Sequence, residues 1–478
     1  MRGRIAVRIL LAGLVPGILA GGILAIEIAG HAPRQVAGLV EALPHGRSGL
    51  SGALTRALAW AFDRTGLGPW LMAANRVDQP TDLPWPLWAG AGSTHDGAPP
   101  PGRTRPVATI ETLRQAIDTA EPGDVILLRP GLYRVTQTHI GVARAGTATA
   151  PITVRALNLG TVVLESELPE AIKVEAPHWH FENLVLKGVC ADDDVCDNGF
   201  HIVGGAAGTT LRNLRLEDFN AHIKINGEND RFPDGGRIAH TTLIGNHVRR
   251  TSSSVTPIDL VAADGWTIDG NLIADFIKIE GNRVSYGAFA KGGGRGTVFT
   301  RNTILCAWRL RDENVQTIGL SFGGGGTGPG VWRGAGQPGV EHADGKMSGN
   351  LIAFCTDDGI YLNRAANSVL RNNTLIATSG IDVRYPESTG RVDANMVDGP
   401  IRSRDGGHFR AAGNIAASLP SMFLGLNPVR GYFEDPARLD LRWRRLPDPV
   451  DGESSAVLCG SPRIGPAPPG AFTDFRAC

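Results

Sequence analysis

NLIAFCTDDGIYLNRAANSVLRN, residues 350–372, is one copy of a repeat that runs through the middle of the chain. The copy opens with Asn350 and an apolar pair, continues into the strand-like phrase Ile360-Tyr-Leu-Asn363, and ends where the next Asn phrase starts at Asn373. Seven such phrases start at Asn213, Asn246, Asn271, Asn302, Asn350, Asn373 and Asn395. Self-similarity at steps of 22 to 48 residues predicts a solenoid, with loops inserted in the longer coils.

The recurring Asn residues predict a structural ladder. A side-chain amide at the same corner of every coil can bond the amides above and below it, and Asn tolerates the tight bend between two strands. We therefore assign these residues to the fold rather than to catalysis.

A short alternating strand follows each Asn phrase, and its polar positions are informative. Period-2 alternation places one set of side chains inside and the other outside. The predicted outer set contains His201, Lys224, Asn226, Asp259, Phe289, Lys291, Ser321, Gly323, Tyr361, Asn363, Asp382 and Arg384. Because neighbouring coils lie about 4.8 Å apart, these residues are expected to share one wall.

Composition agrees with a β-rich protein that has many turns. The chain has 478 residues, 63 Gly and 31 Pro without a collagen period, and its regular apolar strands argue against disorder. Its formal net charge is zero, so no long-range field attracts nucleic acid, and we exclude that class of partner.

The N-terminus predicts a membrane signal. Arg2, Arg4 and Arg8 precede the uncharged apolar run 9–26, which is just long enough to span a bilayer. We favour an uncleaved anchor over residues 1–30, and a cleaved signal peptide is the alternative. Either reading sends the body to the periplasmic or extracellular side.

Six Cys in an exported chain favour disulfides. Cys190 and Cys196 bracket a short loop, Cys306 and Cys355 follow equivalent Asn phrases of adjacent coils, and Cys459 and Cys478 remain at the C-terminus. The expected pairs are therefore Cys190–Cys196, Cys306–Cys355 and Cys459–Cys478. The alternative is that some are free and buried.

Composition changes mark further segments. Residues 31–105 contain helical patterns and Pro- and Trp-rich stretches, which are typical of a juxtamembrane spacer. Ile110, Leu113, Ala116 and Ile117 then repeat like one face of a helix, which could cover the open first coil. We expect the solenoid over 106–420 and a C-terminal extension over 421–478.

The first segment resembles a known family. Residues 109–118, Pro122-Gly-Asp-Val-Ile-Leu-Leu128 with Pro130-Gly-Leu-Tyr133, and Pro151-Ile-Thr-Val-Arg155 are similar to the start of right-handed parallel β-helix proteins of the pectin-lyase-like superfamily. The coils over 199–414 continue the likeness. The resemblance implies an all-β fold, and the nearest members are the chondroitinase B-like lyases of alginate and dermatan.

In those lyases an outward Lys removes the C5 proton of a uronic acid, an Arg one coil further on assists, and a calcium ion neutralises the carboxylate. The phrase Ala288-Phe-Ala-Lys291 looks like the Lys phrase and implies that Lys291 is the base. The next coil departs from the pattern, since Ser321-Phe-Gly-Gly324 stands where Arg is expected. Asp259 is the one clear acidic residue in the preceding coils.

Elementary chemistry leads to the same residue. Proton removal next to a carboxylate needs a base with a lowered pKa and cations that meet the developing charge. Burial and nearby Arg can lower the pKa of a Lys, although an outward Lys can also merely solvate a sheet. The predicted catalytic residues are Lys291, Tyr361 and Arg384. The predicted substrate-binding residues are Lys224, Asn226, Asp259, Phe289, Ser321, Trp332, Asn363, Arg364 and Asp382.

Loops supply the remaining candidates. The insert 326–344 contains Trp332, which could stack on a sugar ring. The Gly-rich stretches 292–296 and 323–328 lack the Lys-Ser/Thr ending of a phosphate loop. Asp192, Asp193, Asp194 and Asp197 offer the hard oxygen ligands that calcium prefers, and a solvated turn is the alternative.

These features together predict an exported polysaccharide-binding β-helix that cleaves a uronate-containing glycan by β-elimination, with calcium as the candidate cofactor. A non-catalytic carbohydrate-binding or cell-envelope scaffold protein is the alternative. Hydrolysis ranks behind elimination, because Asp259 and Asp382 are several coils apart. The oligomeric state is left open.

Overall fold

The computed structural model describes residues 88–93, 101–312, 315–324, 327, 332–333, 339–418, 421–422, 427–451, 457–460 and 464–478. The chain divides into two compact units, residues 1–76 with 417–427 and residues 77–416 with 428–478. The predicted anchor and most of the predicted spacer lie outside the described residues. Within the described ranges, no helix is long and apolar enough to cross a membrane.

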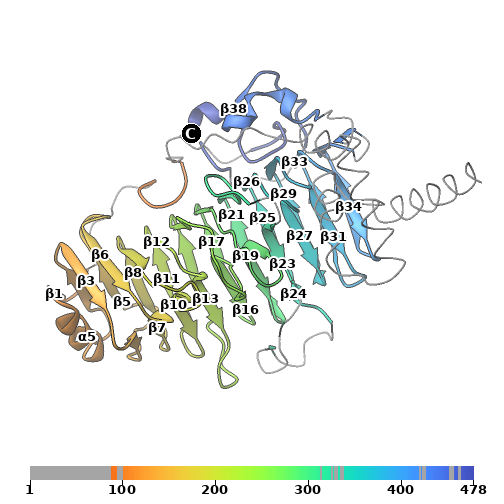
Figure 1. The fold of residues 1–478 in the computed structure, drawn as a ribbon. Coiled ribbons are helices and arrows are strands. Elements are labelled where there is room, and N and C mark those ends of the chain that lie inside the picture. Colours follow the sequence, from red (N-terminus) through yellow and green to blue (C-terminus); the bar gives the residue numbers. More distant parts are fainter. Residues whose placement is uncertain are drawn as a thin grey trace, which may run out of the picture. The chain divides into compact units, whose positions relative to one another are not determined.

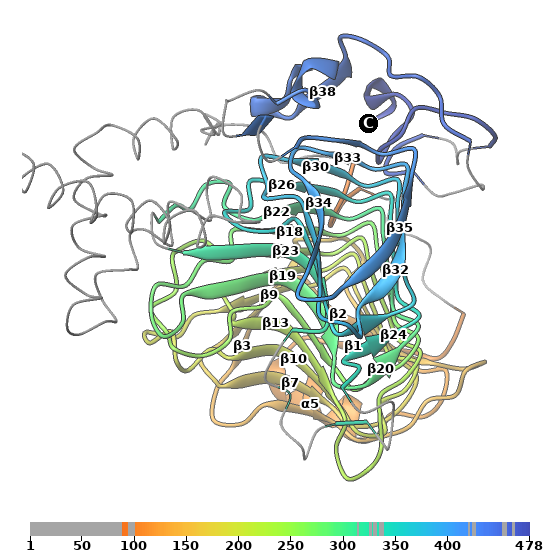
Figure 2. The same cartoon turned by 90° about the vertical axis from the view of Figure 1, so that its right-hand side faces the viewer.

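The second unit is a right-handed parallel β-helix, as the repeat predicts, and successive coils add strands to three long parallel sheets (Figure 1). Figure 2 looks along the stack and shows the sheets as its three faces.

Sheet A contains β1 (Thr104–Val107), β2 (Val125–Leu128), β5 (Ile152–Arg155), β8 (Trp179–Glu182), β11 (Thr210–Arg212), β14 (Arg237–Ala239), β17 (Thr267–Asp269), β21 (Val298–Thr300), β25 (Lys346–Ser348), β29 (Ser368–Arg371), β32 (Thr389–Asp393) and β35 (His408–Ala412). Sheet B contains β3 (Gly131–Val135), β6 (Val162–Ser166), β9 (Val185–Gly188), β12 (Arg215–Glu217), β15 (Thr242–Ile244), β18 (Leu272–Ala274), β22 (Thr303–Leu305), β26 (Leu351–Ala353), β30 (Thr374–Ile376), β33 (Met396–Val397) and β36 (Ile415–Ala416). Sheet C contains β4 (Ile140–Val142), β7 (Glu170–Val174), β10 (Asn198–Val203), β13 (Ala221–Asn226), β16 (Ile258–Val261), β19 (Val284–Lys291), β23 (Gln316–Phe322), β27 (Ile360–Asn363), β31 (Ile381–Arg384) and β34 (Ile401–Arg404).

Short elements complete the unit. They are helix α5 (Ile110–Asp118), the three-strand ladder β20 (Gly294–Arg295), β24 (His342–Ala343) and β28 (Ala365–Ala366), the hairpin β37 (Phe433–Asp435) and β38 (Asp440–Trp443), and the 3-10 turns η3 (Arg430–Tyr432), η4 (Pro436–Arg438) and η5 (Phe475–Ala477).

The interior is an apolar column built from alternate strand residues. On β10, for example, Phe200 and Ile202 are buried in the core while His201 between them faces outward and is partly exposed. The period-2 prediction is therefore confirmed for sheet C, and burial of these apolar faces is the main favourable term in the stability of the stack.

The predicted Asn ladder is present, with one correction. In the later coils each ladder Asn donates its Nδ2 to the Oδ1 of the next, through Asn271, Asn302, Asn350, Asn373, Asn395 and Asn414. In the earlier coils the direction is reversed, because Asn213 donates its Nδ2 to the Oδ1 of the preceding Asn183. The assignment of Asn246 is wrong, because it lies in an exposed turn and bonds Asp218, whereas Thr241 occupies the ladder position and donates its N–H to Asn271.

Helix α5 covers the first coil, as predicted. Thr109 caps its N-terminus, and Leu113, Ala116 and Ile117 are buried against the interior column. The helix thereby shields apolar side chains that an open coil would expose to water.

The outer face of sheet B is covered by segments from both ends of the unit. Trp88 donates its Nε1 to Thr303 at 3.2 Å, and the following backbone bonds Gly270, Thr242 and Asn213 in turn. Residues 88–93, which belong to the predicted spacer, are thus packed on the body. The C-terminal extension, including β38, packs on the later coils of the same face (Figure 1).

All three predicted disulfides, Cys190–Cys196, Cys306–Cys355 and Cys459–Cys478, are present. The second joins adjacent coils. The third closes the C-terminal extension.

Candidate active site on sheet C

Two rows of outward side chains run along sheet C. The register places the first row as Lys173, His201, Lys224, Asp259, Phe289, Ser321, Tyr361, Asp382 and Arg402. The second row contains Asn226, Val261, Lys291, Gly323, Asn363, Arg384 and Arg404. The predicted wall of distant residues is therefore real, since neighbours in each row are about 4.8 Å apart along the stack.

Nearly every cation in these rows has a carboxylate within 4 Å. The pairs are Lys173 with Glu175, His201 with Glu170, Lys224 with Asp259, Arg384 with Asp405, Arg402 with Asp358, and Arg404 with Asp382. Lys291 is the exception among the described residues, because no ion pair or hydrogen bond of its amine is found there.

The surroundings of Lys291 disfavour its charged form. Burial lowers the pKa of Lys291, and nearby Lys224 lowers it further, while Asp259 and Glu341 act in the opposite direction. Its Nζ lies 4.3 Å from the centre of the Phe289 ring, and Phe289 is itself buried and packed edge-on against Tyr286. An amine with a lowered pKa and no carboxylate partner is suited to accept a proton.

Asp259 lies beside this amine on the neighbouring strand β16. It is 4% exposed, and its Oδ2 accepts a hydrogen bond from Lys224. Its Oδ1 is buried and has no partner among the described residues. A buried acceptor without a donor is costly, so this oxygen destabilises the ionised carboxylate of Asp259.

Tyr361 lies two coils further along the wall. Its hydroxyl oxygen accepts hydrogen bonds from Asn363 Nδ2 at 3.0 Å and Arg384 Nη1 at 3.4 Å. Because the oxygen accepts both bonds, the phenolic hydrogen remains available to a third group. Burial raises the pKa of Tyr361, so the phenol is protonated at neutral pH.

Gly323 occupies the second-row position between Lys291 and Asn363. Its φ is +73°, and a Cβ there would lie 1.8 Å from the Asn363 carbonyl oxygen, so a side chain cannot be accommodated. The departure from the resembled family, whose Arg is expected in this coil, therefore goes with a backbone that excludes a side chain at Gly323. The second row has no side chain between Lys291 and Asn363, and the Cβ of Glu341 lies 3.0 Å from where a Gly323 Cβ would be.

Two predicted substrate contacts are sealed inside the wall. Ser321 is fully buried, and its hydroxyl lies 2.7 Å from the Gly323 carbonyl oxygen and 3.0 Å from that of Tyr361. Asp382 is also fully buried and pairs with Arg404 and Arg402. The alternation of the strands correctly predicted that both side chains point outward. Both are buried, however, so neither can contact a ligand in this conformation.

The other predicted contacts lie around the wall. The Oδ1 of Asn226 accepts a hydrogen bond from His201 Nε2 at 2.8 Å, and its Nδ2 donates to the Gly227 carbonyl. Arg364 is half exposed and stacks on Tyr385. Trp332 is half-buried, and its Nε1 lies 3.2 Å from the point where a Cβ on Gly293 would be, which places it close to Lys291 in the chain fold.

Sequence reasoning missed Tyr286. This phenol lies against Phe289 and close to Tyr361 on the outer face, and burial raises its pKa. A Cβ on Gly287 would point at the core residues Ile304 and Phe276, and Ala288 is also buried in the core. Two consecutive inward residues break the period of two, so alternation could not place Tyr286 outside.

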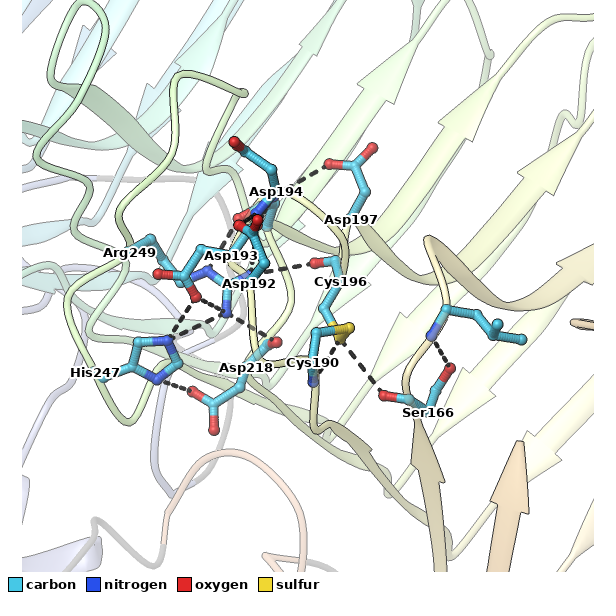
Figure 3. Close-up of a disulfide and its surroundings, with 12 residues drawn as sticks. Ser166, Cys190, Asp192, Asp193, Asp194, Cys196, Asp197, Asp218, His247 and Arg249 are labelled. Carbon is cyan, nitrogen blue, oxygen red and sulfur yellow. Dashed lines mark hydrogen bonds and ion pairs between the residues drawn. A yellow bond between two sulfur atoms is a disulfide. The ribbon is translucent and has the colours of Figure 1, made fainter. Parts of the chain in front are cut away.

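The acidic loop predicted to bind calcium is an ion-pair cluster (Figure 3). Asp193 accepts hydrogen bonds from His247 Nε2 and the Arg250 N–H and lies 3.0 Å from Arg249 Nη1. Asp192 and Asp194 bond within the loop and to Thr251, and Asp197 accepts from Asn220. No group of three or more His, Cys, Asp or Glu residues in the described ranges could hold a metal ion. With Asp193 already matched by Arg249, this donor set does not fit calcium.

Comparison with known proteins gives one partial family match. A family model described as chondroitinase B matches residues 107–196, which confirms the resemblance of the first segment. The structure is similar to an alginate lyase from Paenibacillus sp. str. FPU-7, at 12% identity over 66% of this chain and 99% of that one, with a TM-score of 0.36.

It is also similar to a rhamnogalacturonan lyase, at 13% identity over 66% of this chain and 87% of that one, with a TM-score of 0.45. A pectate lyase is similar at 14% identity over 75% of this chain and 90% of that one, with a TM-score of 0.41. No curated protein sequence matches the chain.

Proposed function

We propose that this protein binds a uronate-containing polysaccharide along sheet C and cleaves it by β-elimination, with Lys291 as the base. The observation that carries the proposal is the amine of Lys291, which is partly buried, has a lowered pKa and has no carboxylate partner among the described residues. The other basic side chains of the two rows each have a carboxylate within 4 Å.

The reaction uses groups on both sides of Gly323. Lys291 on β19 and Tyr361 on β27 are two coils apart, about 10 Å along the stack, and Tyr361 is 6% exposed, so its hydroxyl meets the sugar from within the wall. The neutral amine takes the C5 proton, the C5–H electrons form the C4=C5 double bond, and the C4–O bond breaks. The departing oxygen takes the proton of Tyr361.

Arg384 and Asn363 support the second half of this step. Both donate to the Tyr361 oxygen, so they stabilise the phenolate that forms when the proton leaves. Arg384 is in turn held by Asp405 and by stacking on Tyr385, which fixes its guanidinium in place. We therefore assign Tyr361 as the proton donor and Arg384 and Asn363 as its supports.

We also propose that the folded body works outside the cytoplasm, on the periplasmic or extracellular side. Three disulfides support this location, since such bonds persist in oxidising compartments. The apolar run 9–26 would tether the body to the membrane.

A non-catalytic carbohydrate-binding or envelope protein is the second candidate. The sealing of Ser321 and Asp382 favours it, because a wall with fewer accessible polar groups offers fewer contacts to a reacting sugar.

A panel of acidic glycans separates the two functions. The protein is incubated with alginate, pectate, dermatan and hyaluronan, and the absorbance of the unsaturated product is followed. We expect one glycan to give a steady rise, and binding of a glycan without any rise would favour the non-catalytic function.

A further inference from the structure

Three described residues of the insert between β23 and β24, Thr327, Arg333 and Glu341, hold the turn that follows Lys291. Both backbone groups of Gly292 are bound by the insert: its N–H donates to Glu341 Oε2 at 3.0 Å, and its carbonyl accepts from the Arg333 N–H at 2.9 Å. The residue directly after the proposed base is therefore fixed by two insert residues that are distant in sequence.

Glu341 has several bonds at this turn. Its carboxylate also accepts a hydrogen bond from the Thr327 hydroxyl at 3.0 Å, and its backbone carbonyl accepts from the Gly293 N–H at 2.8 Å. The side chain is 5% exposed, so its negative charge is only weakly screened by water. No positively charged side chain among the described residues forms an ion pair with it.

Arg333 secures the far side of the insert. Its guanidinium binds both oxygens of Asp234, at 2.6 and 2.9 Å, lies 3.3 Å from Asp264, and stacks over Phe232. A bidentate Arg–carboxylate pair fixes geometry as well as charge. The backbone of Arg333 is thereby held where its N–H meets Gly292.

The charges that face the Lys291 amine come from three elements. Asp259 lies on β16, Lys224 on β13, and Glu341 at the end of the insert, and Tyr286 is the further titratable group near Phe289 on β19. Lys224 and Asp259 pair with each other and act on the pKa of Lys291 in opposite directions, Asp259 more strongly. Glu341 also raises this pKa, and it has no ion-pair partner among the described residues.

We infer that Glu341 is a positioning residue, which holds the turn after Lys291 in place and offsets the positive charge of its amine. The inference deepens the proposed function, since its consequence for catalysis rests on Lys291 being the base. The electrostatic part holds whether or not the protein turns over a glycan.

The test measures the reactivity of the amine directly. Full-length protein is labelled with acetic anhydride at a series of pH values, and labelling of the Lys291 peptide is quantified by mass spectrometry. Glu341→Gln keeps an oxygen that can accept the Gly292 N–H but removes the charge. Glu341→Asp keeps the charge but shortens the reach, and Glu280→Gln at an exposed Glu before β19 is the matched control.

Loss of the Glu341 charge removes a stabiliser of the ammonium, so the pKa of Lys291 should fall. In Glu341→Gln we expect the half-labelling pH of Lys291 to move lower and labelling at a fixed acidic pH to be at least about twofold faster. Glu341→Asp should label like wild type while the Gly292 amide exchanges faster with solvent deuterium. Glu280→Gln should change neither.

An unchanged half-labelling pH in Glu341→Gln would overturn the inference, as would equal acceleration in Glu341→Asp, which would point to access rather than charge. If wild type shows no turnover on any glycan but the labelling shift is present, the proposed function fails and the inference stands. If turnover is present, the acidic limb of its pH profile should move with the labelling curve.

Discussion

At the scale of single residues, the neighbours of a side chain decide its chemistry. Lys224 and Lys291 are both outward lysines on sheet C, but Lys224 is paired with Asp259 and Lys291 is not. The unpaired amine, lowered in pKa by burial, is the one suited to act as a base.

The two lysines should respond differently to the same substitution. Lys291→Met should abolish turnover and leave thermal unfolding unchanged, because no described partner loses a bond. Lys224→Met should lower the free energy of unfolding by about 1–3 kcal/mol, since it leaves the buried Asp259 without its donor. Urea unfolding and product absorbance measure both effects, and strong destabilisation by Lys291→Met would argue for a structural role.

Tyr361→Phe tests the proton donor. The ring is kept, so packing is preserved, but the proton for the leaving oxygen is lost. We expect kcat to fall by about 10²–10⁴-fold with KM nearly unchanged. Steady-state kinetics on the glycan that is cleaved measure kcat and KM separately. A change in KM alone would show that Tyr361 binds substrate without donating the proton.

For single residues, the sequence predicts the direction in which a side chain points better than it predicts how exposed that side chain is. Alternation correctly places Lys291, Tyr361 and Asp382 on the outer face, but it carries no information on what covers them. Asp382 is buried by its arginine partners. Alternation does not predict that Tyr286 points outward, because the two residues that follow it, Gly287 and Ala288, both point inward.

At the scale of elements, the Asn ladder joins coils through buried side-chain bonds. Asn350 accepts the N–H of Asn302 and donates to the Phe299 carbonyl as well as to Asn373. The sequence phrase alone does not identify a ladder member, since Asn246 has the phrase but not the position. Thr241 replaces it because a hydroxyl can also bond the neighbouring backbone, here the Leu214 N–H.

The ladder makes a paired prediction. Asn350→Ala should lower the free energy of unfolding by about 2–4 kcal/mol, because the buried Asn302 N–H and Phe299 carbonyl lose a partner. Asn246→Ala, the sequence look-alike on an exposed turn, should cost less than about 0.5 kcal/mol. If guanidinium unfolding showed the same loss of free energy for both variants, the hydrogen bonds of the ladder would contribute no more to stability than an exposed turn.

At the scale of the whole molecule, buried histidines link stability to pH. Burial lowers the pKa of His222 to about 4 and that of His342 to about 3. An unfolded histidine has a pKa near 6.5, so below that pH the unfolded chain takes up protons that the folded chain does not. Stability is therefore complete above about pH 6.5 and falls as the pH decreases toward 4.

His342→Phe should reduce this dependence. His342 is fully buried and stacks on Phe322 at 4.4 Å, a contact that Phe can keep. At pH 5 each buried histidine should lower the wild-type free energy of unfolding by about 2 kcal/mol. The free energy of unfolding of the variant should therefore fall by about 2 kcal/mol less than that of the wild type between pH 7 and pH 5. Identical pH profiles in chemical unfolding would mean that His342 becomes protonated without opening the fold.

Metal removal is a second test on the whole molecule. Because the acidic loop is matched by Arg249 and His247, a calcium chelator should leave both the thermal midpoint and turnover unchanged. A drop in either that added calcium reverses would show that the loop rearranges to bind the ion.

The overall architecture was largely predictable, because the repeat, the alternating strands and the capping helix are local patterns. The packing of residues 88–93 on sheet B was not, since their Pro- and Trp-rich composition is also typical of a spacer. Their position depends on long-range bonds such as Trp88 to Thr303, which no local pattern encodes.

The most direct test of the central claim is the mass of the products that wild type and Lys291→Met release from an acidic glycan. Elimination breaks the chain without adding water, so the new non-reducing end should be an unsaturated uronate, one water lighter than a hydrolysis product. We predict this species with wild type and its absence with a folded Lys291→Met. Full-mass hydrolysis products, or unsaturated products from both proteins, would contradict the assignment of Lys291 as the base.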